Sequence, residues 1–220
     1  ILTVFSISSV LVLLAPQLAV AEDEGISTDR PDFVESSDTV GKGRWQIETS
    51  WAYARSRDDG GVRARETSTP TLLRWGFSEN WEARLETDGR LYTRISDASG
   101  SLHDKGWADV SLGLKWHARD GEEDSGQPGL GLLMHVDMDT GSRHYRGQGW
   151  RPSLRGVAEW EWSNGWGLGV MPGLVHDRTE DNRDYLAGIF GIVVGKRVSE
   201  QLRFFGEIAM EQIASNTHGG

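Results

Sequence analysis

The feature that most limits the fold is a short unit of alternating apolar and polar residues, which recurs along most of the chain. Residues 44–55 form the first clear copy. One set of alternating positions is mostly apolar and the other is polar or small: Trp45, Ile47, Thr49, Trp51 and Tyr53 against Arg44, Gln46, Glu48, Ser50 and Ala52. Successive strand side chains point to opposite faces, so the unit predicts a strand with one apolar and one wet face.

Nine segments follow this pattern and are expected to be strands: residues 43–56, 63–75, 80–95, 106–118, 129–138, 152–162, 165–176, 184–198 and 201–213. Past the N-terminal segment, no run of about 18 apolar residues exists, which excludes helical membrane spans. Half-apolar strands in this number are typical of an antiparallel, up-and-down transmembrane β-barrel, because only one face of each strand meets lipid.

The connections between these segments alternate in length. The short ones are 76–79, 163–165 and 199–200, the long polar ones are 57–62, 96–105, 139–151 and 177–183, and 119–128 is intermediate. Asn164-Gly165 is a strong signal for a tight hairpin. Outer-membrane barrels have short periplasmic turns and longer outer loops. A periplasmic N-terminus would therefore place all the short turns on the periplasmic side.

A barrel needs an even number of strands to return its C-terminus to the periplasm. The ninth segment would run outward, and residues 214–220 resemble the start of a loop. We therefore expect residues 43–220 to form a C-terminally truncated barrel that lacks at least one strand, with three as the favoured number.

The polar faces carry charges that neither lipid nor a sandwich core accepts without a cost of several kcal/mol each. In 80–95, Trp81, Ala83, Leu85, Leu91 and Ile95 oppose six charged residues. Such charges must line a wet lumen or face solvent. The candidate lumen-lining residues are Glu48, Glu82, Arg84, Glu86, Asp88, Arg90, Arg94, Glu159, Glu161, Glu207 and Glu211. Because the assignment follows alternation, a β-bulge would move a whole strand's residues to the other face.

The chain contains ten Trp residues, most of them near predicted strand ends. Trp suits a membrane interface because its ring is apolar and its N–H is polar. The alternative is a soluble, secreted β-sandwich with these rings in its core, and it predicts a monomer that is stable without detergent.

Composition and motifs argue against several other classes. The chain has no Cys and a formal net charge of −10, which excludes disulfides and argues against a nucleic-acid partner. Six scattered His residues form no metal-binding pair, and the run Asp109–Gly113 lacks the first Gly of a nucleophile elbow. We expect no enzyme, no catalytic residue, no metal and no cofactor.

The N-terminus differs in kind from the rest. Residues 1–21 are apolar and end in Ala-Val-Ala, which predicts a signal peptide whose first residues are missing. An N-terminal membrane anchor is the alternative. Residues 22–42 are polar and irregular, and we expect them to form a periplasmic N-terminal segment of a Gram-negative outer-membrane protein.

That segment carries a motif with a family resemblance. The run from Ile26 to Ser36 reads ISTDRPDFVES and resembles the TDRPDFTES signature of a bacterial outer-membrane transporter family labelled for the MetA pathway of phenol degradation. Residues 40–48, 69–76 and 107–115 are similar to it as well. The resemblance covers most of 26–213, with Val34 where Thr is common. It implies a barrel of twelve strands, about nine of them present here, and uptake of aromatic or other hydrophobic compounds.

The motif residues are the second set of candidates: Thr28, Asp29, Arg30, Pro31, Asp32, Phe33 and Glu35. Physically, the segment is a periplasmic latch or a plug, with Arg30 pairing either with nearby acids or with lumenal carboxylates. A structural role that closes the barrel floor and a role in contacting substrate are both open at this point.

Three functions follow for the chain. The first is a porin-like transporter or channel that passes small, aromatic or hydrophobic solutes passively. The second is a non-conducting structural or adhesive barrel that acts through its outer loops, and the third is the soluble sandwich. The barrel readings require outer-membrane lipid and the barrel-assembly machinery as partners. The oligomeric state is not determined by the sequence.

Overall fold

The computed structural model describes residues 28–30, 33–57, 60–97, 99–123, 125–179, 181, 183–199 and 202–215, with backbone alone for 211–215. The predicted signal peptide, Pro31, Asp32 and residues 216–220 lie outside this part of the chain. None of the described residues forms a helix that is long and apolar enough to cross a membrane.

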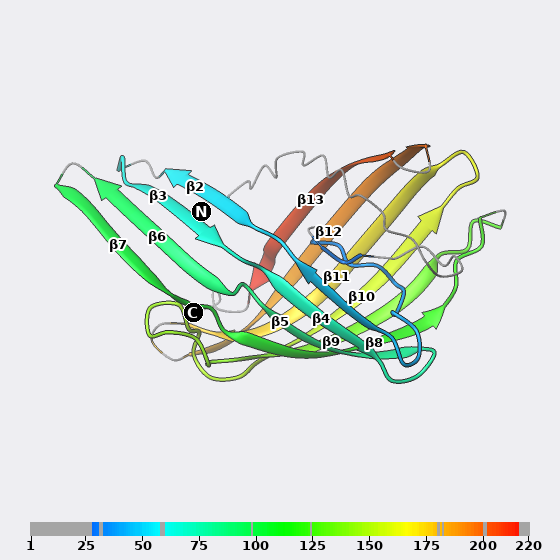
Figure 1. Ribbon diagram of the computed structural model, residues 1–220, viewed down its shortest axis with the longest axis horizontal. Helices are drawn as coiled ribbons and strands as arrows, with labels where there is room; N and C mark the ends of the chain where they lie inside the picture. The colour runs from blue at the N-terminus through cyan, green and yellow to red at the C-terminus, as the bar shows by residue number, and fades with distance from the viewer. Residues whose placement is uncertain are drawn as a thin grey trace.

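The described chain is all-β and antiparallel, with an up-and-down strand order, as predicted. Its strands are β1 Trp45–Thr49, β2 Ala52–Arg57, β3 Arg63–Ser68, β4 Thr71–Gly76, β5 Trp81–Thr87, β6 Arg90–Asp97, β7 Gly100–Trp107, β8 Val110–Arg119, β9 Gly129–Met138, β10 Arg151–Glu161, β11 Trp166–Arg178, β12 Asp184–Ser199 and β13 Leu202–Ser215. Nine of them form one sheet in the order β1-β4-β5-β8-β9-β10-β11-β12-β13, and β2-β3-β6-β7 form a second. Figure 1 shows a strongly curved wall that the four-stranded sheet extends at the upper left. Within the described residues, β1 and β13 are the two edges of the larger sheet.

The last five predicted segments each correspond to one strand, β9 to β13, and the first four each span an interruption between two strands. The interruption lies near the middle of the first three segments and near the start of 106–118. Backbone hydrogen bonds bridge the interruptions, from Ser50 N to the Pro70 carbonyl (2.9 Å) and from Ala108 N to the Gly89 carbonyl (2.8 Å). Pro70 has no N–H to donate, and Gly89 has a φ of 67°, which favours glycine. These residues explain why the ladder breaks at this level.

The prediction of a long loop over 96–105 is wrong. Strand β6 runs to Asp97 and β7 begins at Gly100, so most of that range is strand. The Asp97 carboxylate accepts hydrogen bonds from Ser99 N (2.8 Å) and Gly100 N (3.0 Å), which closes a tight turn. A run rich in Asp, Ser and Gly thus makes a hairpin end rather than an open loop.

The assignment of Arg90 and Arg94 to the lumen is also wrong, because a bulge intervenes. Thr71 pairs with Thr87 and Thr67 with Tyr92, so four steps on one strand face five steps on the next. The extra residue falls at Asp88–Gly89 and reverses the faces beyond it. Arg90 and Arg94 therefore lie on the outer face of β6, while Glu82, Arg84 and Glu86 lie on the inner face of β5.

The two faces of the nine-stranded sheet have opposite character. The outer face exposes apolar side chains, among them Ile47 (70% exposed), Leu112, Leu154 and Ile208. The inner face buries a small apolar cluster and many charged groups. The cluster consists of Val34, Leu133, Val157, Met171 and Val193, with Phe33 and Phe205 packed against it.

One end of the outer face carries a continuous row of stacked aromatic rings. Neighbouring centroids are 5.3 Å apart for Trp45–Trp75, 6.0 Å for Trp75–Phe77, 6.5 Å for Phe77–Trp81 and 6.1 Å for Trp81–Trp116. The row crosses β1, β4, β5 and β8 beside their short-turn end. Trp at strand ends therefore forms a surface band here rather than a buried core.

Candidate functional site

The described part of the N-terminal segment, residues 28–30 and 33–40, lies against the inner face of the wall and is held there by glutamates. Glu48 on β1 accepts hydrogen bonds from the backbone N–H groups of Asp29 (2.9 Å) and Arg30 (2.8 Å). Glu207 on β13 accepts from Phe33 (2.9 Å) and Val34 (2.6 Å). The segment thus connects the two edge strands of the nine-stranded sheet.

Two further glutamates hold the rest of the segment in the same way. Glu159 on β10 accepts a hydrogen bond from Ser37 N, and Glu82 on β5 accepts one from Val40 N (2.9 Å). Hydrogen bonds to an ionised carboxylate are shorter and stronger than neutral ones. These contacts depend on the path of the segment's backbone rather than on its side chains.

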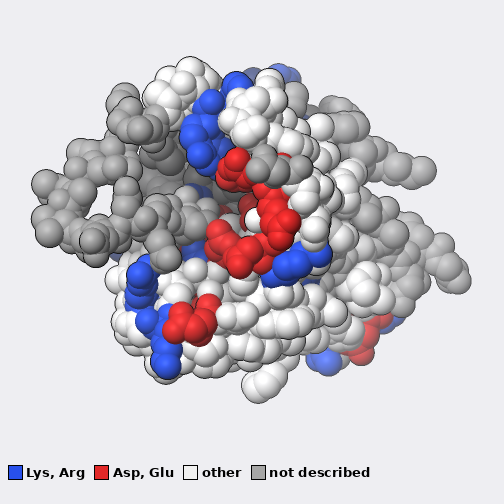
Figure 2. Space-filling view, turned by 90° about the vertical axis from the view of Figure 1, so that its right-hand side faces the viewer, with Lys and Arg blue, Asp and Glu red and all other residues white. Residues whose placement is uncertain are grey.

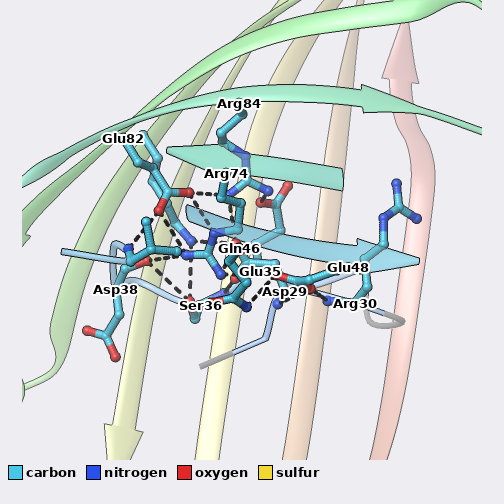
Figure 3. A network of polar contacts seen from close by, with 12 residues as sticks. Asp29, Arg30, Glu35, Ser36, Asp38, Gln46, Glu48, Arg74, Glu82 and Arg84 are labelled. Carbon is cyan, nitrogen blue, oxygen red and sulfur yellow. Dashed lines mark hydrogen bonds and ion pairs between the residues drawn. The ribbon is translucent and has the colours of Figure 1, made fainter. Parts of the chain in front are cut away.

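Asp29 is the centre of a buried ion-pair network (Figure 3). Its Oδ2 lies 2.6 Å from Arg84 Nη1, 2.8 Å from Lys115 Nζ and 3.3 Å from Arg74 Nη1. Its Oδ1 accepts a hydrogen bond from Ser36 N (2.8 Å), which folds the segment back on itself. Burial alone would raise the pKa of Asp29, but Lys115, Arg84 and Arg74 together hold it well below its usual range.

Arg74 and Arg84 also join the wall carboxylates to one another. Arg74 grips Glu82 with two nitrogens, Nε to Oε1 at 2.9 Å and Nη2 to Oε2 at 3.0 Å, and reaches Glu48 Oε1 at 3.1 Å. Arg84 contacts Glu82 and Glu35, and Arg155 contacts Glu35 from the other side. Removing one member of such a buried network costs about 3–5 kcal/mol, because the partner is left as an uncompensated charge.

A cluster of two glutamates and a histidine, between the segment and the wall, has the composition of a metal site. Glu35, Glu86 and His135 place ligand atoms within 4.8 Å of one another. Both carboxylates are already engaged by arginines, Glu35 by Arg84 and Arg155, and Glu86 by Arg30. This arrangement serves as another ion-pair contact between segment and wall.

Glycines in the wall let the segment approach closely. A Cβ at Gly131 would lie 3.0 Å from the backbone of Ser37, and one at Gly191 would lie 2.7 Å from the side chains of Phe33 and Val34. A larger residue at either position would push the segment away from the wall. The described interior is filled around the segment. Six of its side chains are each at most 2% exposed: Asp29, Arg74, Glu82, Lys115, Leu133 and Met171.

The predicted lumen-lining residues separate into three groups. Glu48, Glu82, Arg84, Glu86, Glu159 and Glu207 lie on the inner face, and each bonds to the N-terminal segment. Asp88 is exposed at the strand interruption, Arg90 and Arg94 are on the outer face, and Glu161 is exposed and 3.4 Å from Arg197. The side chain of Glu211 lies outside the described residues.

The described motif residues lie on the inner side of the curved wall. Asp29, Arg30, Phe33 and Glu35 all contact the inner face, and Thr28 is exposed. Sequence reasoning missed Arg74, Lys115 and Arg155 as members of the site. Lys115 and Arg155 alternate with apolar residues on their strands, so the same reasoning that selected the glutamates would have found them.

A comparison with family models covers nearly all of this structure. Residues 28–219 match the model of the family described as the MetA pathway of phenol degradation. The chain belongs to that family. The match begins at Thr28, so the family pattern includes the segment inside the wall as well as the strands. No match to the chain was found among curated proteins.

Proposed function

We propose that the protein is an outer-membrane β-barrel that passes small solutes, phenol-like compounds among them, when its N-terminal segment leaves the interior. The observation that carries the proposal is the distribution of side chains across the wall. Apolar and aromatic residues are exposed on the outer face, while charged residues are buried on the inner face. This distribution suits a wall between lipid and a polar interior.

The contacts of the segment support a displaceable plug. It is held mainly by hydrogen bonds and ion pairs, to Glu48, Glu82, Glu159 and Glu207 among others, and its apolar contribution to the core is Val34 with Phe33. Water can replace polar contacts of this kind, so the segment can be released without exposing a large apolar surface. The family description is what directs the solute class towards phenol-like compounds.

A specific observation also favours the second candidate, a non-conducting structural barrel. The interior around Asp29 is fully packed and its charges are paired, which is what a permanent plug requires. The two functions differ in whether release of the segment creates a path for solute.

A disulfide lock separates them. A Cβ at Gly129 would lie 2.8 Å from Ser37 Oγ, close to the spacing between a Cβ and the far sulfur of a disulfide, and the chain has no other cysteine. The double variant Ser37→Cys/Gly129→Cys would be reconstituted in liposomes and tested for phenol flux. We expect flux in the reduced state and none in the oxidised state, with the two single variants insensitive to oxidant. Absence of flux in the reduced variant and in the wild type would favour the non-conducting barrel.

A further inference from the structure

The outer face of the four-stranded sheet carries a row of basic residues in direct register. Arg55 pairs with Arg65, Arg65 with Arg94, and Arg94 with His103, across all four strands. Like charges directly opposite one another destabilise a sheet. A chain that places three arginines side by side therefore sacrifices stability at this position, which calls for a compensating partner.

None of the outward positions of this sheet within the described residues carries an acidic side chain that could neutralise this row. Its outward positions in β2, β3, β6 and β7 are Tyr53, Arg55, Arg57, Arg63, Arg65, Thr67, Arg90, Tyr92, Arg94, Ser96, Ser101, His103, Lys105 and Trp107. The inward and outward positions continue without a shift from β1 into β2, because the pairs Thr49↔Thr71 and Ala52↔Ser68 are three residues apart on both strands. Arg65, Arg94 and Lys105 are exposed and form no ion pair within the described part of the chain. We call this surface the basic face.

Other surfaces of the molecule mix the two signs. Figure 2 looks from the right-hand side of Figure 1 and shows acidic side chains gathered near the middle of the view, with basic ones beside them. With an overall formal charge of −10, the chain has acids to spare, yet the basic face contains none. The segregation is therefore local and specific.

Aromatic residues border the basic face on the side where it meets the apolar outer face of the nine-stranded sheet. Trp51 and Tyr53 stack with centroids 6.1 Å apart, and the guanidinium groups of Arg55 and Arg90 lie 4.9 Å from the ring centroids of Tyr53 and Tyr92. Along the first strand the outer face runs from Trp45 through Ile47 to Trp51 and Tyr53, and then to Arg55. This is the order of aromatic interface, hydrocarbon, second interface and headgroup, over about the nine residues that a spanning strand needs.

The basic face is also hollowed. An open depression of about 660 Å³ is lined by Arg65, Arg94, His103 and Lys105 together with Thr67, Tyr92, Thr93 and Asp104. The carboxylate of Asp104 bonds to His144 rather than to a member of the arginine row. Its size is in the range of sites that hold a small molecule or a sugar headgroup. Arginine forks match phosphate oxygens in a bidentate manner, and lysine adds a point charge.

We propose that the basic face binds the phosphate groups of a lipopolysaccharide molecule in the outer leaflet. This inference rests on the proposed function, since it requires the wall to stand in an outer membrane with the four-stranded sheet at its outer end. The arginine row would then take the place of the divalent cations that otherwise bridge neighbouring phosphates. The bound lipid would relieve the repulsion between Arg55, Arg65 and Arg94.

The test uses the full chain in detergent micelles with EDTA present, so that no divalent cation bridges lipid to carboxylate. The probes are lipopolysaccharide, the same lipid after enzymatic dephosphorylation, and phosphatidylglycerol. The variant Arg65→Gln/Arg94→Gln is compared with Arg197→Gln/Arg203→Gln, which removes another cross-strand arginine pair at the opposite end. Both variants must retain the gel band shift of the folded protein.

We expect the Arg65/Arg94 variant to bind lipopolysaccharide at least about tenfold more weakly than the wild type, since each lost contact is charge-assisted. The Arg197/Arg203 variant should bind as the wild type does, and dephosphorylation should abolish the difference between variants. Equal binding by both variants, or equal binding of phosphatidylglycerol and lipopolysaccharide, would overturn the inference. Phenol flux through the reduced lock variant is measured separately, so a failure here leaves the transport proposal standing.

Discussion

The inner face of the nine-stranded sheet and the outer face of the four-stranded sheet hold the same kinds of cation in opposite states. Arg74, Arg84 and Lys115 are buried, and each pairs with carboxylates of the wall or the N-terminal segment. Arg65 and Arg94 are exposed and lie opposite one another. Within the described residues, these interior cations find carboxylate partners in the chain itself, whereas the exterior row is left to a partner. The difference indicates that the interior cations hold the N-terminal segment, whereas the basic face is available to a partner.

The largest effect is expected from the centre of the interior network. Asp29→Asn leaves Lys115, Arg74 and Arg84 without their shared carboxylate, and should lower the free energy of unfolding by about 3–5 kcal/mol. Urea unfolding in detergent, followed by the gel band shift, measures it. Asp38→Asn in the same segment is the matched control, because its side chain is 57% exposed and surface changes cost less than about 0.5 kcal/mol. Equal losses in the two variants would break the comparison.

The attachment of the segment to β13 should contribute less. Glu207→Gln keeps one acceptor but removes the charge that Phe33 N and Val34 N contact, so we expect a loss of about 1.5–3 kcal/mol. Hydrogen exchange of these two amides should accelerate while the strand amides stay protected. The control is Glu161→Gln, an exposed group whose ion pair is worth about 1 kcal/mol or less. Unchanged exchange at Phe33 and Val34 would contradict the assigned contact.

The pH dependence of Asp29 gives a third, differential test. Its pKa is lowered in the folded protein, so its contribution to stability is present above the unfolded value of about 3.9 and is lost as pH falls through the folded value. The difference in unfolding free energy between wild type and Asp29→Asn should therefore be constant from pH 8 to about pH 4. It should shrink only at lower pH. A difference that shrinks between pH 7 and pH 5 would mean that Asp29 is not held by the three cations.

The smallest effect is expected on the basic face and has the opposite sign. Arg65→Gln removes the like-charge repulsion of Arg65 with its cross-strand neighbours Arg55 and Arg94. It should therefore raise the free energy of unfolding by about 0.2–1 kcal/mol in detergent without lipopolysaccharide. Thr67→Ala on the same strand removes no charge and is the control. A loss of stability in Arg65→Gln would show that the row is already compensated within the protein.

Alternation alone predicted the nine segments and the inward glutamates, because the period-2 pattern is local and strong. It failed at Arg90 and Arg94, where one extra residue at Asp88–Gly89 reversed the faces, and at 96–105, where an Asp97 turn shortened a loop. The pairing of Phe33 with Glu207 joins residues 174 positions apart. No local pattern states which wall carboxylate meets which segment amide, so the contacts between the segment and the wall could not be predicted from the sequence.

The central claim is that this wall has lipid outside and its own N-terminal segment inside. The most direct test is heat-modifiability of the full-length protein in isolated outer membranes, with folded and boiled samples compared on a denaturing gel. The account predicts a band shift between folded and boiled protein in the membrane fraction. After partial heating, a smaller fraction of Asp29→Asn than of Asp38→Asn should remain in the folded band. A single band in the soluble periplasmic fraction would contradict it, and the exposed apolar outer face would then need a protein partner instead of lipid.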